Sequence, residues 1–208
     1  MSEPDRPAPG PRPRQARAVA TRKRVHDAAL AEFARVGVDA ARVADIVAAA
    51  GVSWGTFFHY FPRKQDVLLE SSAHVCAAFA GAIDAGIERA DPIEDIVRAA
   101  FAAMAAAAPR SPALRAAILR EVGSNPGTLT VYLDGRAPTL VPAMAALIAH
   151  GQRRGAIRDD EPAAALAAIL VYGVLGAARR HHTGPAFDVS TPVYVLAQRI
   201  ILDGMRTR

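Results

Sequence analysis

The stretch from Val43 to Phe61, VADIVAAAGVSWGTFFHYF, predicts two short helices joined by a tight turn. The first helix should end at Ala50, because Gly51 follows at the position where a chain leaving a helix most often needs a left-handed residue. Ser53 can then cap the next helix by accepting a hydrogen bond from one of its free backbone N–H groups. Helices this short are unstable alone, so both must pack against neighbouring helices. The apolar residues of the first helix recur on one face: Val43, Ile46, Val47 and Ala50.

The second helix of this stretch should carry an apolar anchoring side and a free side. A packed helix with a protruding first turn is how helix-turn-helix proteins enter the major groove, with the preceding helix lying across the DNA backbone. A helical hairpin inside an all-helical core would have the same glycine at the end of one helix and the same serine cap on the next. The turn alone therefore leaves open whether it reads DNA or packs in a core. The expected anchors are Phe57, Phe58 and Phe61. The residues expected nearer the free surface are Trp54, Gly55, Thr56, His59 and Tyr60.

The distribution of charge separates the two interpretations. Residues 1–64 contain 11 Lys and Arg against 6 Asp and Glu, a net charge of +5, whereas residues 65–208 contain 14 of each and are neutral. The whole net charge of the chain therefore lies with the predicted turn. Basic side chains placed beside phosphates release condensed counterions, so a basic block around a protruding helix is the expected electrostatic signature of DNA binding.

Residues Thr21 to Leu69 resemble the DNA-binding domain of the TetR family of bacterial transcriptional regulators. The resemblance implies an all-α fold, with an N-terminal three-helix helix-turn-helix domain and a larger C-terminal helical bundle for ligand binding and dimerisation. A weaker similarity runs from Gly151 to Asp160, ahead of an Ala-rich helix. The residues that carry the main resemblance are Ala28, Ala29, Phe33, Gly37, Asp45, Ile46, Ala50, Gly51, Val52, Ser53, Gly55, Thr56, Tyr60, Phe61, Lys64 and Leu68.

The resemblance also implies a set of DNA-contacting residues, within which Lys64 anchors phosphates while Trp54 and Thr56 read bases. Arg42 stands where many relatives have a threonine that caps the helix and contacts a phosphate. Phe58 stands where they usually have a tyrosine, so a phosphate-bonding hydroxyl is lost. A ring at Trp54 can press on a thymine methyl or cover the neighbouring helix. The expected DNA-binding residues are Arg42, Ser53, Trp54, Gly55, Thr56, His59, Tyr60 and Lys64.

Composition divides the chain into three expected parts. Residues 1–16 form a Pro- and Arg-rich basic arm with little to bury, which predicts disorder. Residues 17–63 form the helix-turn-helix domain, and residues 64–208 form a helical domain for effector binding and dimerisation, without the alternating pattern of a sheet. Between Arg12 and Arg24 there are six Lys and Arg and no acid. A solvated tail and an arm that follows the DNA backbone or enters a minor groove are both compatible with this basic segment.

The C-terminal part is expected to form a homodimer through its last two helices. Their apolar surface exceeds what one exposed face of a monomer should show, and Gly173 would let a second helix approach closely. A two-fold dimer places two DNA-binding domains on successive turns of one DNA face, so the operator should be an inverted repeat. Alternatively, the apolar faces of these two helices pack only against the core of the monomer. The expected interface residues are Leu166, Ile169, Leu170, Gly173, Val193, Leu196, Ala197 and Ile200.

An apolar effector pocket is expected in the same part of the chain. Methionine and aromatic side chains suit an adaptable cavity, and His150 or Tyr172 would supply a polar fixing point. Ordinary core packing is the alternative for each residue taken singly. The candidate pocket residues are Phe79, Phe101, Met104, Met144, Leu147, His150 and Tyr172.

Several other classes of protein are disfavoured by composition and motifs. The single cysteine, Cys76, excludes an internal disulfide and a Cys-rich zinc site, and its place on an apolar stripe predicts burial rather than redox sensing. No run approaches the roughly 20 apolar residues of a membrane span, and the N-terminus lacks an apolar signal core, so a cytoplasmic protein is expected. Neither an HExxH motif nor a Gly-rich phosphate loop is present, and the adjacent His181 and His182 do not share a helical face. We therefore expect no enzyme, no metal and no cofactor.

These observations predict a sequence-specific repressor that a small-molecule ligand releases from an inverted-repeat operator. Release by ligand is what the family resemblance implies, and the ligand should be apolar. The alternative is a structural, nucleoid-type DNA-binding protein without an effector. Footprinting distinguishes them, because only the repressor should protect one inverted repeat.

Overall fold

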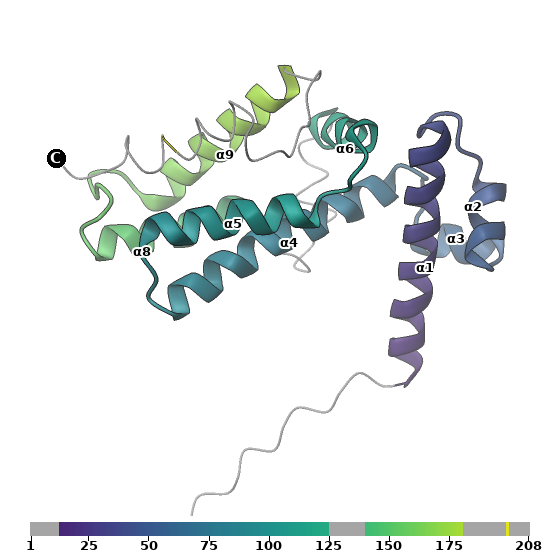
Figure 1. Cartoon of the computed structure of the whole chain (residues 1–208), viewed down its shortest axis with the longest axis horizontal. Helices are drawn as coiled ribbons and strands as arrows, with labels where there is room; N and C mark the ends of the chain where they lie inside the picture. Colours follow the sequence, from purple (N-terminus) through teal and green to yellow (C-terminus); the bar gives the residue numbers. More distant parts are fainter. Residues whose placement is uncertain (1–12, 125–139, 181–198, 200–208) are drawn as a thin grey trace, which may run out of the picture. The chain divides into compact units, whose positions relative to one another are not determined.

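The computed structural model describes residues 13–124, 140–180 and 199, and the regular structure of these residues is helical, without a strand among them (Figure 1). The chain divides into two compact units, Met1–Lys64 and Gln65–Arg208, called here the N-terminal and C-terminal units. The predicted all-α fold class is confirmed. The helices are α1 (Pro13–Val36), α2 (Val43–Ala50), α3 (Trp54–Tyr60), α4 (Asp66–Glu88), α5 (Ile93–Ala107), α6 (Pro112–Ser124), α8 (Leu140–Arg153) and α9 (Ala163–Arg180).

The N-terminal unit is built from α1, α2 and α3 around a small apolar core. Helix α1 packs on α2, and α2 packs on α3. Gly37 ends α1 with a positive φ of 84°, and its N–H donates to the carbonyl of Phe33 at 2.9 Å. This left-handed residue turns the chain back so that α2 can return along α1. The core residues are Val25, Ala29, Phe33, Ala41, Ile46, Val47, Ala50, Phe57 and Phe61.

Helix α1 begins earlier than the sequence suggests. It starts at Pro13, so residues 13–16, which we expected in a disordered arm, are helical. Proline at the first helical position is favourable, because its missing N–H has no partner within the helix and its φ is already helical. The rest of the expected arm, residues 1–12, lies outside the described residues. The side chains of residues 14–20 are all exposed, so the first two turns of α1 contribute no core residue.

The C-terminal unit has α4 at its centre. Helix α4 packs against α5, α6 and α8, while α9 packs against α8 and α6. Gly86 of α4 is required where α4 meets α5, because a Cβ there would lie 2.7 Å from Cγ1 of Ile96. Gly151 plays the same part against Ile157, at 2.6 Å from its Cδ1. The main core residues are Val75, Phe79, Ala80, Ile83, Ile96, Val97, Ala100, Phe101, Met104, Met144, Leu147, Ile148, Ile157, Ala167 and Val171.

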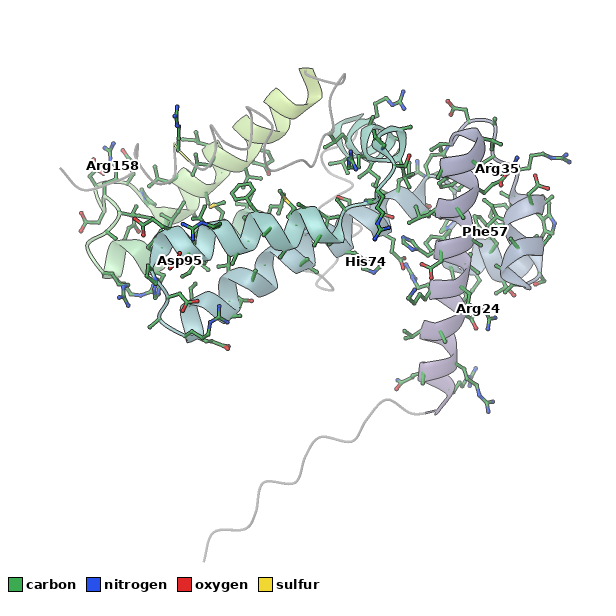
Figure 2. The ribbon with its side chains drawn as sticks, viewed as in Figure 1. Arg24, Arg35, Phe57, His74, Asp95 and Arg158 are labelled. Atoms are coloured by element: carbon green, nitrogen blue, oxygen red, sulfur yellow. The ribbon has the colours of Figure 1, made fainter. Side chains whose placement is uncertain are left out.

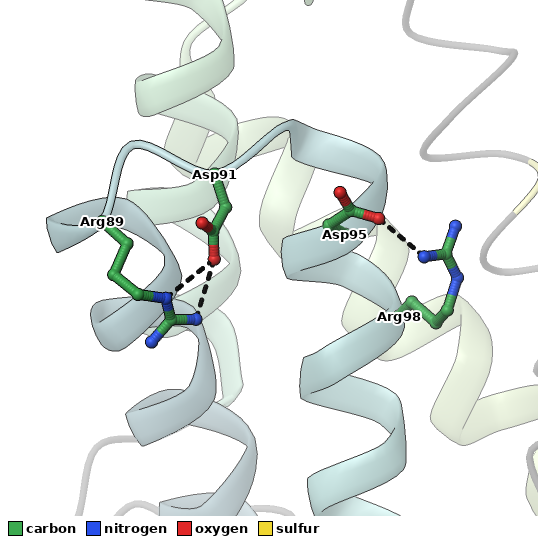
Figure 3. A network of polar contacts seen from close by, with 4 residues as sticks. All are labelled: Arg89, Asp91, Asp95 and Arg98. Carbon is green, nitrogen blue, oxygen red and sulfur yellow. Dashed lines mark hydrogen bonds and ion pairs between the residues drawn. The ribbon is translucent and has the colours of Figure 1, made fainter.

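Exposed ion pairs flank the turn between α4 and α5 (Figure 3). The guanidinium of Arg89 donates from Nε and Nη2 to Oδ2 of Asp91 at 3.0 and 2.8 Å. Arg98 donates to Oδ1 of Asp95 at 2.6 Å, one turn along α5. Exposed pairs of this kind contribute about 0 to 1 kcal/mol each. These four charged side chains form ion pairs on the surface of a solvated turn. We assign them no catalytic or binding role.

Among the described residues, helix α4 alone has the length and apolar composition that could cross a membrane. Two thirds of its apolar window, 67%, is buried inside the protein. A helix surrounded by α5, α6 and α8 must be apolar on most of its faces, so the core position of α4 accounts for its composition.

Candidate DNA-binding site

The turn between α2 and α3 has the predicted chemistry. Gly51 adopts the left-handed conformation, with φ 63° and ψ 43°. Ser53 has extended backbone angles, and its Oγ accepts a hydrogen bond from the N–H of Thr56 at 3.2 Å. The two hydroxyls of Ser53 and Thr56 also lie 3.0 Å apart and are hydrogen-bonded to each other. The predicted glycine C-cap and serine N-cap are therefore confirmed.

The prediction that Phe58 anchors α3 is wrong. Phe57 and Phe61 are fully buried, whereas Phe58 is 43% exposed. Phe58 is rotated by about 100° from Phe57, and the packing of α3 buries the side that carries Phe57 and Phe61. Its ring instead lies beside Trp54, one turn earlier, with 6.1 Å between the ring centroids. Figure 2 shows Phe57 inside the N-terminal unit.

The outer face of α3, defined here as Trp54, Gly55, Phe58 and His59, is exposed. Trp54 is 53% exposed, which agrees with a role in contacting a partner rather than covering the neighbouring helix. Thr56 and Tyr60 are half-buried, at the edges of this face. The hydroxyl of Thr56 faces the Ser53 cap, so its contact with a base would have to share that hydroxyl.

Arg22 of α1 holds the end of α3 in a way that the sequence did not indicate. Its guanidinium carbon lies 6.0 Å from the ring centroid of Tyr60 and 5.1 Å from that of Phe61. His59 meets the same Tyr60 ring edge to face, with 5.1 Å between centroids. A guanidinium over an aromatic face is attracted by the ring's quadrupole. Local sequence spacing cannot reveal this contact, because its partners lie on helices far apart in the chain.

Arg42 occupies the N-cap position of α2 without capping it. Its backbone is extended, with φ −101° and ψ 133°, and its side chain makes no capping hydrogen bond. The side chain is exposed, so its charge is available on the surface of the N-terminal unit. Arg42 therefore does not supply the capping bond that a threonine gives in many relatives.

Lys64 is engaged within the N-terminal unit. Its Nζ donates to the carbonyl of Asp39 at 2.8 Å and to that of Ala41 at 3.0 Å. These bonds fasten the end of the unit to the loop between α1 and α2. An ammonium group has three N–H donors, so one remains for a phosphate. The phosphate contact of Lys64 stays a prediction, and the structure adds a stabilising role.

Apart from Arg22, the basic residues of α1 fall into two groups. Lys23 is paired with Asp27, with 2.5 Å between Nζ and Oδ2, and Arg35 makes a bidentate pair with Glu32 at 2.8 and 2.7 Å. The other group is exposed and, among the described residues, has no ion pair. Its spacings of three and seven place it along one stripe of the helix. This unpaired stripe consists of Arg14, Arg17 and Arg24, the last of which is labelled in Figure 2.

The candidate pocket residues of the C-terminal unit separate into a buried group and one exception. Phe79 and Phe101 meet edge to face, with 5.5 Å between ring centroids. Tyr172 does not share their core: it is 62% exposed on α9. The neighbouring Val171 takes the buried side of the helix instead. The residues that share the core are Phe79, Phe101, Met104, Met144 and Leu147.

His150 is buried on α8, and its Nε2 has no hydrogen-bond partner among the described residues. Burial lowers the pKa of His150 below the ordinary value, and the charges of Arg154 and Arg153 lower it further. The imidazole is therefore held neutral at physiological pH, with one ring nitrogen unsatisfied. A buried polar atom without a partner is unfavourable, so a hydrogen-bonding group that reached this nitrogen would stabilise the protein.

The residues expected in the dimer interface differ in their exposure. On α9, Ile169 is 71% exposed and lies with Tyr172 and Gly173 on an exposed face. Leu166 and Leu170 are half-buried against the core of the C-terminal unit. The remaining expected interface residues lie outside the described residues: Val193, Leu196, Ala197 and Ile200.

Cys76 is buried, as predicted from its apolar stripe. Burial raises the pKa of its thiol to about 11, although a hydrogen bond with Ser72 opposes the shift. The thiol is protonated at neutral pH and is a poor nucleophile. Within the described residues, no group of three or more His, Cys, Asp or Glu side chains is arranged to hold a metal ion.

In the N-terminal unit a tight turn is followed by a capped helix with an exposed outer face, and the unit as a whole is basic. These features are typical of helix-turn-helix DNA-binding proteins. Residues 25–71 match the family described as bacterial regulatory proteins, tetR family. The N-terminal unit is thus similar to the DNA-binding domain of the TetR family, and the whole chain has the fold seen in TetR-family transcriptional regulators. The resemblance found in the sequence is confirmed.

Three solved structures illustrate this fold. FadR from Thermus thermophilus, a TetR-family transcriptional repressor in complex with lauroyl-CoA, is 24% identical, with 90% of this chain and 96% of that chain covered and a TM-score of 0.69. A TetR-family regulator from Mesorhizobium loti is 17% identical, with coverage of 92% and 99% and a TM-score of 0.62. The fatty acid degradation regulator FadR from Bacillus halodurans is 23% identical, with coverage of 90% and 97% and a TM-score of 0.60. No curated protein matches the chain.

Proposed function

We propose that the protein is a homodimeric repressor that binds an inverted-repeat operator and is released by a small, largely apolar molecule. The observation that supports this most is the outer face of α3, which is capped by Ser53, exposed, and carried by a unit that holds the chain's whole net charge. Binding to chromosomal DNA places this function in the cytoplasm. TetR-family regulators are DNA-binding proteins rather than enzymes, and no catalytic role is proposed.

The DNA contacts are divided between phosphates and bases. Arg42 and Lys64 present positive charge at the edges of the unit and position it on the backbone. Trp54, Gly55 and His59 face outward from α3 and meet base edges in the major groove. The remaining proposed contacts, which lie beside these, are Ser53, Thr56 and Tyr60.

The unpaired arginine stripe of α1 extends the phosphate contacts. Replacing Arg14 and Arg17 with alanine together should weaken binding to all DNA sequences alike, because both side chains are exposed and unpaired by acids among the described residues. The proposed dimer carries four of these arginines, and each lost phosphate contact removes about 0.9 from the slope of log affinity against log salt, so the slope should fall by about 3.6. Binding titrations over a range of salt concentrations measure it.

Lys23→Ala is the matched control for this prediction, because Lys23 lies on the same helix but is paired with Asp27. Its slope should stay close to that of the unchanged protein. If the Arg14 and Arg17 double variant keeps the original slope, the first turns of α1 do not contact DNA.

A second copy of the chain is the proposed partner of the exposed face of α9. Ile169 and Tyr172 are large exposed side chains, and a Cβ added at Gly173 would meet no atom of the described residues within 4 Å. Exposed apolar surface of this kind marks an interaction site. A two-fold axis through α9 would bring the same face of two copies together and present two DNA-binding units to one operator.

The proposed effector site lies around the buried aromatic and methionine residues of α4, α5 and α8. Phe79, Phe101 and Met104 are adaptable apolar side chains there, and His150 supplies an unsatisfied nitrogen at the end of α8. The Thermus thermophilus relative binds lauroyl-CoA, a ligand with a long apolar chain. An effector with an apolar body and one hydrogen-bonding group would suit these side chains.

The buried His150 predicts a pH dependence of stability. Its pKa is lower in the folded protein than in the unfolded chain, so the unfolded chain binds more protons near and below pH 6.5. Its contribution to the free energy of unfolding is therefore fully present above about pH 6.5 and is lost as the pH falls towards the folded pKa. His150→Leu should flatten this loss, as measured by urea unfolding between about pH 8 and pH 5.5.

His74→Leu serves as the control, because His74 is exposed on α4. This variant should retain the pH dependence of the unchanged protein. An equal pH dependence in the His150 and His74 variants would show that the buried imidazole is not responsible.

Release follows from linkage between the two sites. Helix α4 begins at Asp66, two residues after Lys64, and carries Phe79 of the proposed effector site. A ligand that favours one position of α4 would change the separation of the two DNA-binding units in the dimer. The operator must then weaken ligand binding by the same factor as the ligand weakens operator binding.

Selection of genomic fragments that the protein binds is the first test of this function. The second test is whether small molecules handled by the products of the neighbouring genes release the protein from these fragments. Recovery of one operator and its release by such a molecule are expected. The nucleoid-type alternative predicts fragments without a shared sequence and no release.

A further inference from the structure

The outer face of α3 contains an aromatic edge formed by Trp54 and Phe58. Both are large apolar side chains that remain substantially exposed, at 53% and 43%. Their ring centroids lie 6.1 Å apart, and the planes are tilted by 35°, so the two rings form one continuous apolar surface. Phe58 is supported from behind by the buried ring of Phe57, which it meets edge to face at 5.2 Å. The edge is therefore held in place by the core.

The fold itself does not require this edge or the glycine beside it. Exposed apolar area is unfavourable in water, and polar side chains at these positions would leave the core unchanged. A Cβ added to Gly55 would meet only Oγ of Ser53, at an ordinary contact distance of 3.8 Å. A glycine inside a helix destabilises it by about 0.5 to 1 kcal/mol relative to alanine. The missing side chain leaves the surface next to Trp54 open to close approach.

The hydrogen-bonding groups nearby are partly engaged. The hydroxyls of Ser53 and Thr56 bond to each other at 3.0 Å, and Oγ of Ser53 also accepts from the backbone of α3. The first turn of α3 thus presents more apolar than polar surface to a partner. In the major groove of DNA, the apolar group that distinguishes one base pair from the others is the 5-methyl group of thymine.

We infer that Trp54 and Phe58 together read thymine methyl groups, so the operator's sequence is recognised in large part by apolar contact. The inference rests on the proposed function, since it requires α3 to enter the major groove. It assigns Phe58 a role in specificity, at a position where the family pattern would place a phosphate-bonding tyrosine. Operator half-sites should accordingly contain thymines at the steps that face α3.

The test compares thymine with deoxyuridine, which differs only by the methyl group. The full chain is first used to select a preferred site from random-sequence duplex DNA, and each thymine of that site is then replaced by deoxyuridine. Loss of one buried methyl should weaken binding about fourfold at the contacted steps. Thymines outside these steps should show no change.

The double variant Trp54→Ala, Phe58→Ala assigns the effect to these rings. Both side chains are exposed, so the variant should fold, as circular dichroism can verify. It should bind the thymine and deoxyuridine sites equally. The Arg14→Ala, Arg17→Ala variant is the matched control, because it should bind both DNAs more weakly while keeping the fourfold difference between them.

The outcomes separate the inference from the function on which it rests. A selected site that binds equally well with deoxyuridine, or that contains no thymine, overturns the methyl reading and leaves the regulator intact. A double variant that keeps the deoxyuridine effect overturns it as well. Selection of no preferred sequence overturns the proposed function and the inference with it.

Discussion

Replacing Ile169 with aspartate should convert the protein into monomers and lower its affinity for the operator at least a hundredfold. Ile169 is 71% exposed on α9, beside the exposed Tyr172, so the folded monomer should accept a charge there. A dimer formed through this face would bury two uncompensated carboxylates, at about 3 to 5 kcal/mol for each unpaired charge. A single DNA-binding unit also loses the advantage of binding two half-sites at once.

Analytical ultracentrifugation and operator titration measure the two effects of this substitution. Ala164→Asp is the matched control, since Ala164 is exposed in the first turn of α9 but lies on another side of the helix from Ile169. It should leave the dimer and the operator affinity unchanged. An Ile169→Asp protein that remains dimeric and binds the operator normally would show that this face of α9 is not the interface.

Phe57→Ala should destabilise the N-terminal unit by about 3 to 5 kcal/mol, whereas Phe58→Ala should destabilise it by only about 1 kcal/mol. The two residues are adjacent, but Phe57 is completely buried and Phe58 is not. Removing the Phe57 ring leaves a cavity among α1, α2 and α3. A unit of this size has a small free energy of unfolding, so the loss should unfold it. Its DNA binding should be lost through unfolding.

Urea unfolding followed by the fluorescence of Trp54, the single tryptophan of the chain, reports the stability of the N-terminal unit directly. Circular dichroism provides the second probe. Equal destabilisation by both substitutions would contradict the assignment of Phe57 to the core and of Phe58 to the outer face.

Local chemistry was enough to predict the turn between α2 and α3. A glycine that must be left-handed and a serine that must accept from a free N–H depend on residues within one turn of the chain, and both appear as expected at Gly51 and Ser53. The family resemblance added the three-helix arrangement of the N-terminal unit and the helical body, which the fold confirms.

Contacts between distant parts of the chain were not predictable in the same way. Three phenylalanines within five residues all suit an apolar anchor, and only the positions of α1 and α2 decide that Phe58 faces outward. Tyr172 belongs to a helix that is apolar on several sides, so periodicity did not show which side faces the core. The bonds from Lys64 to the carbonyls of Asp39 and Ala41 join residues 25 and 23 positions apart.

A footprint of the full chain on its selected DNA tests the central proposal, that a dimer reads one operator through α3, most directly. Hydroxyl-radical cleavage should show one protected inverted repeat, with two half-sites centred about one helical turn or a multiple of it apart on the same DNA face. Deoxyuridine at the contacted thymines should weaken the protection. Uniform coverage of the fragment without a preferred sequence would contradict the proposal and favour a structural DNA-binding protein.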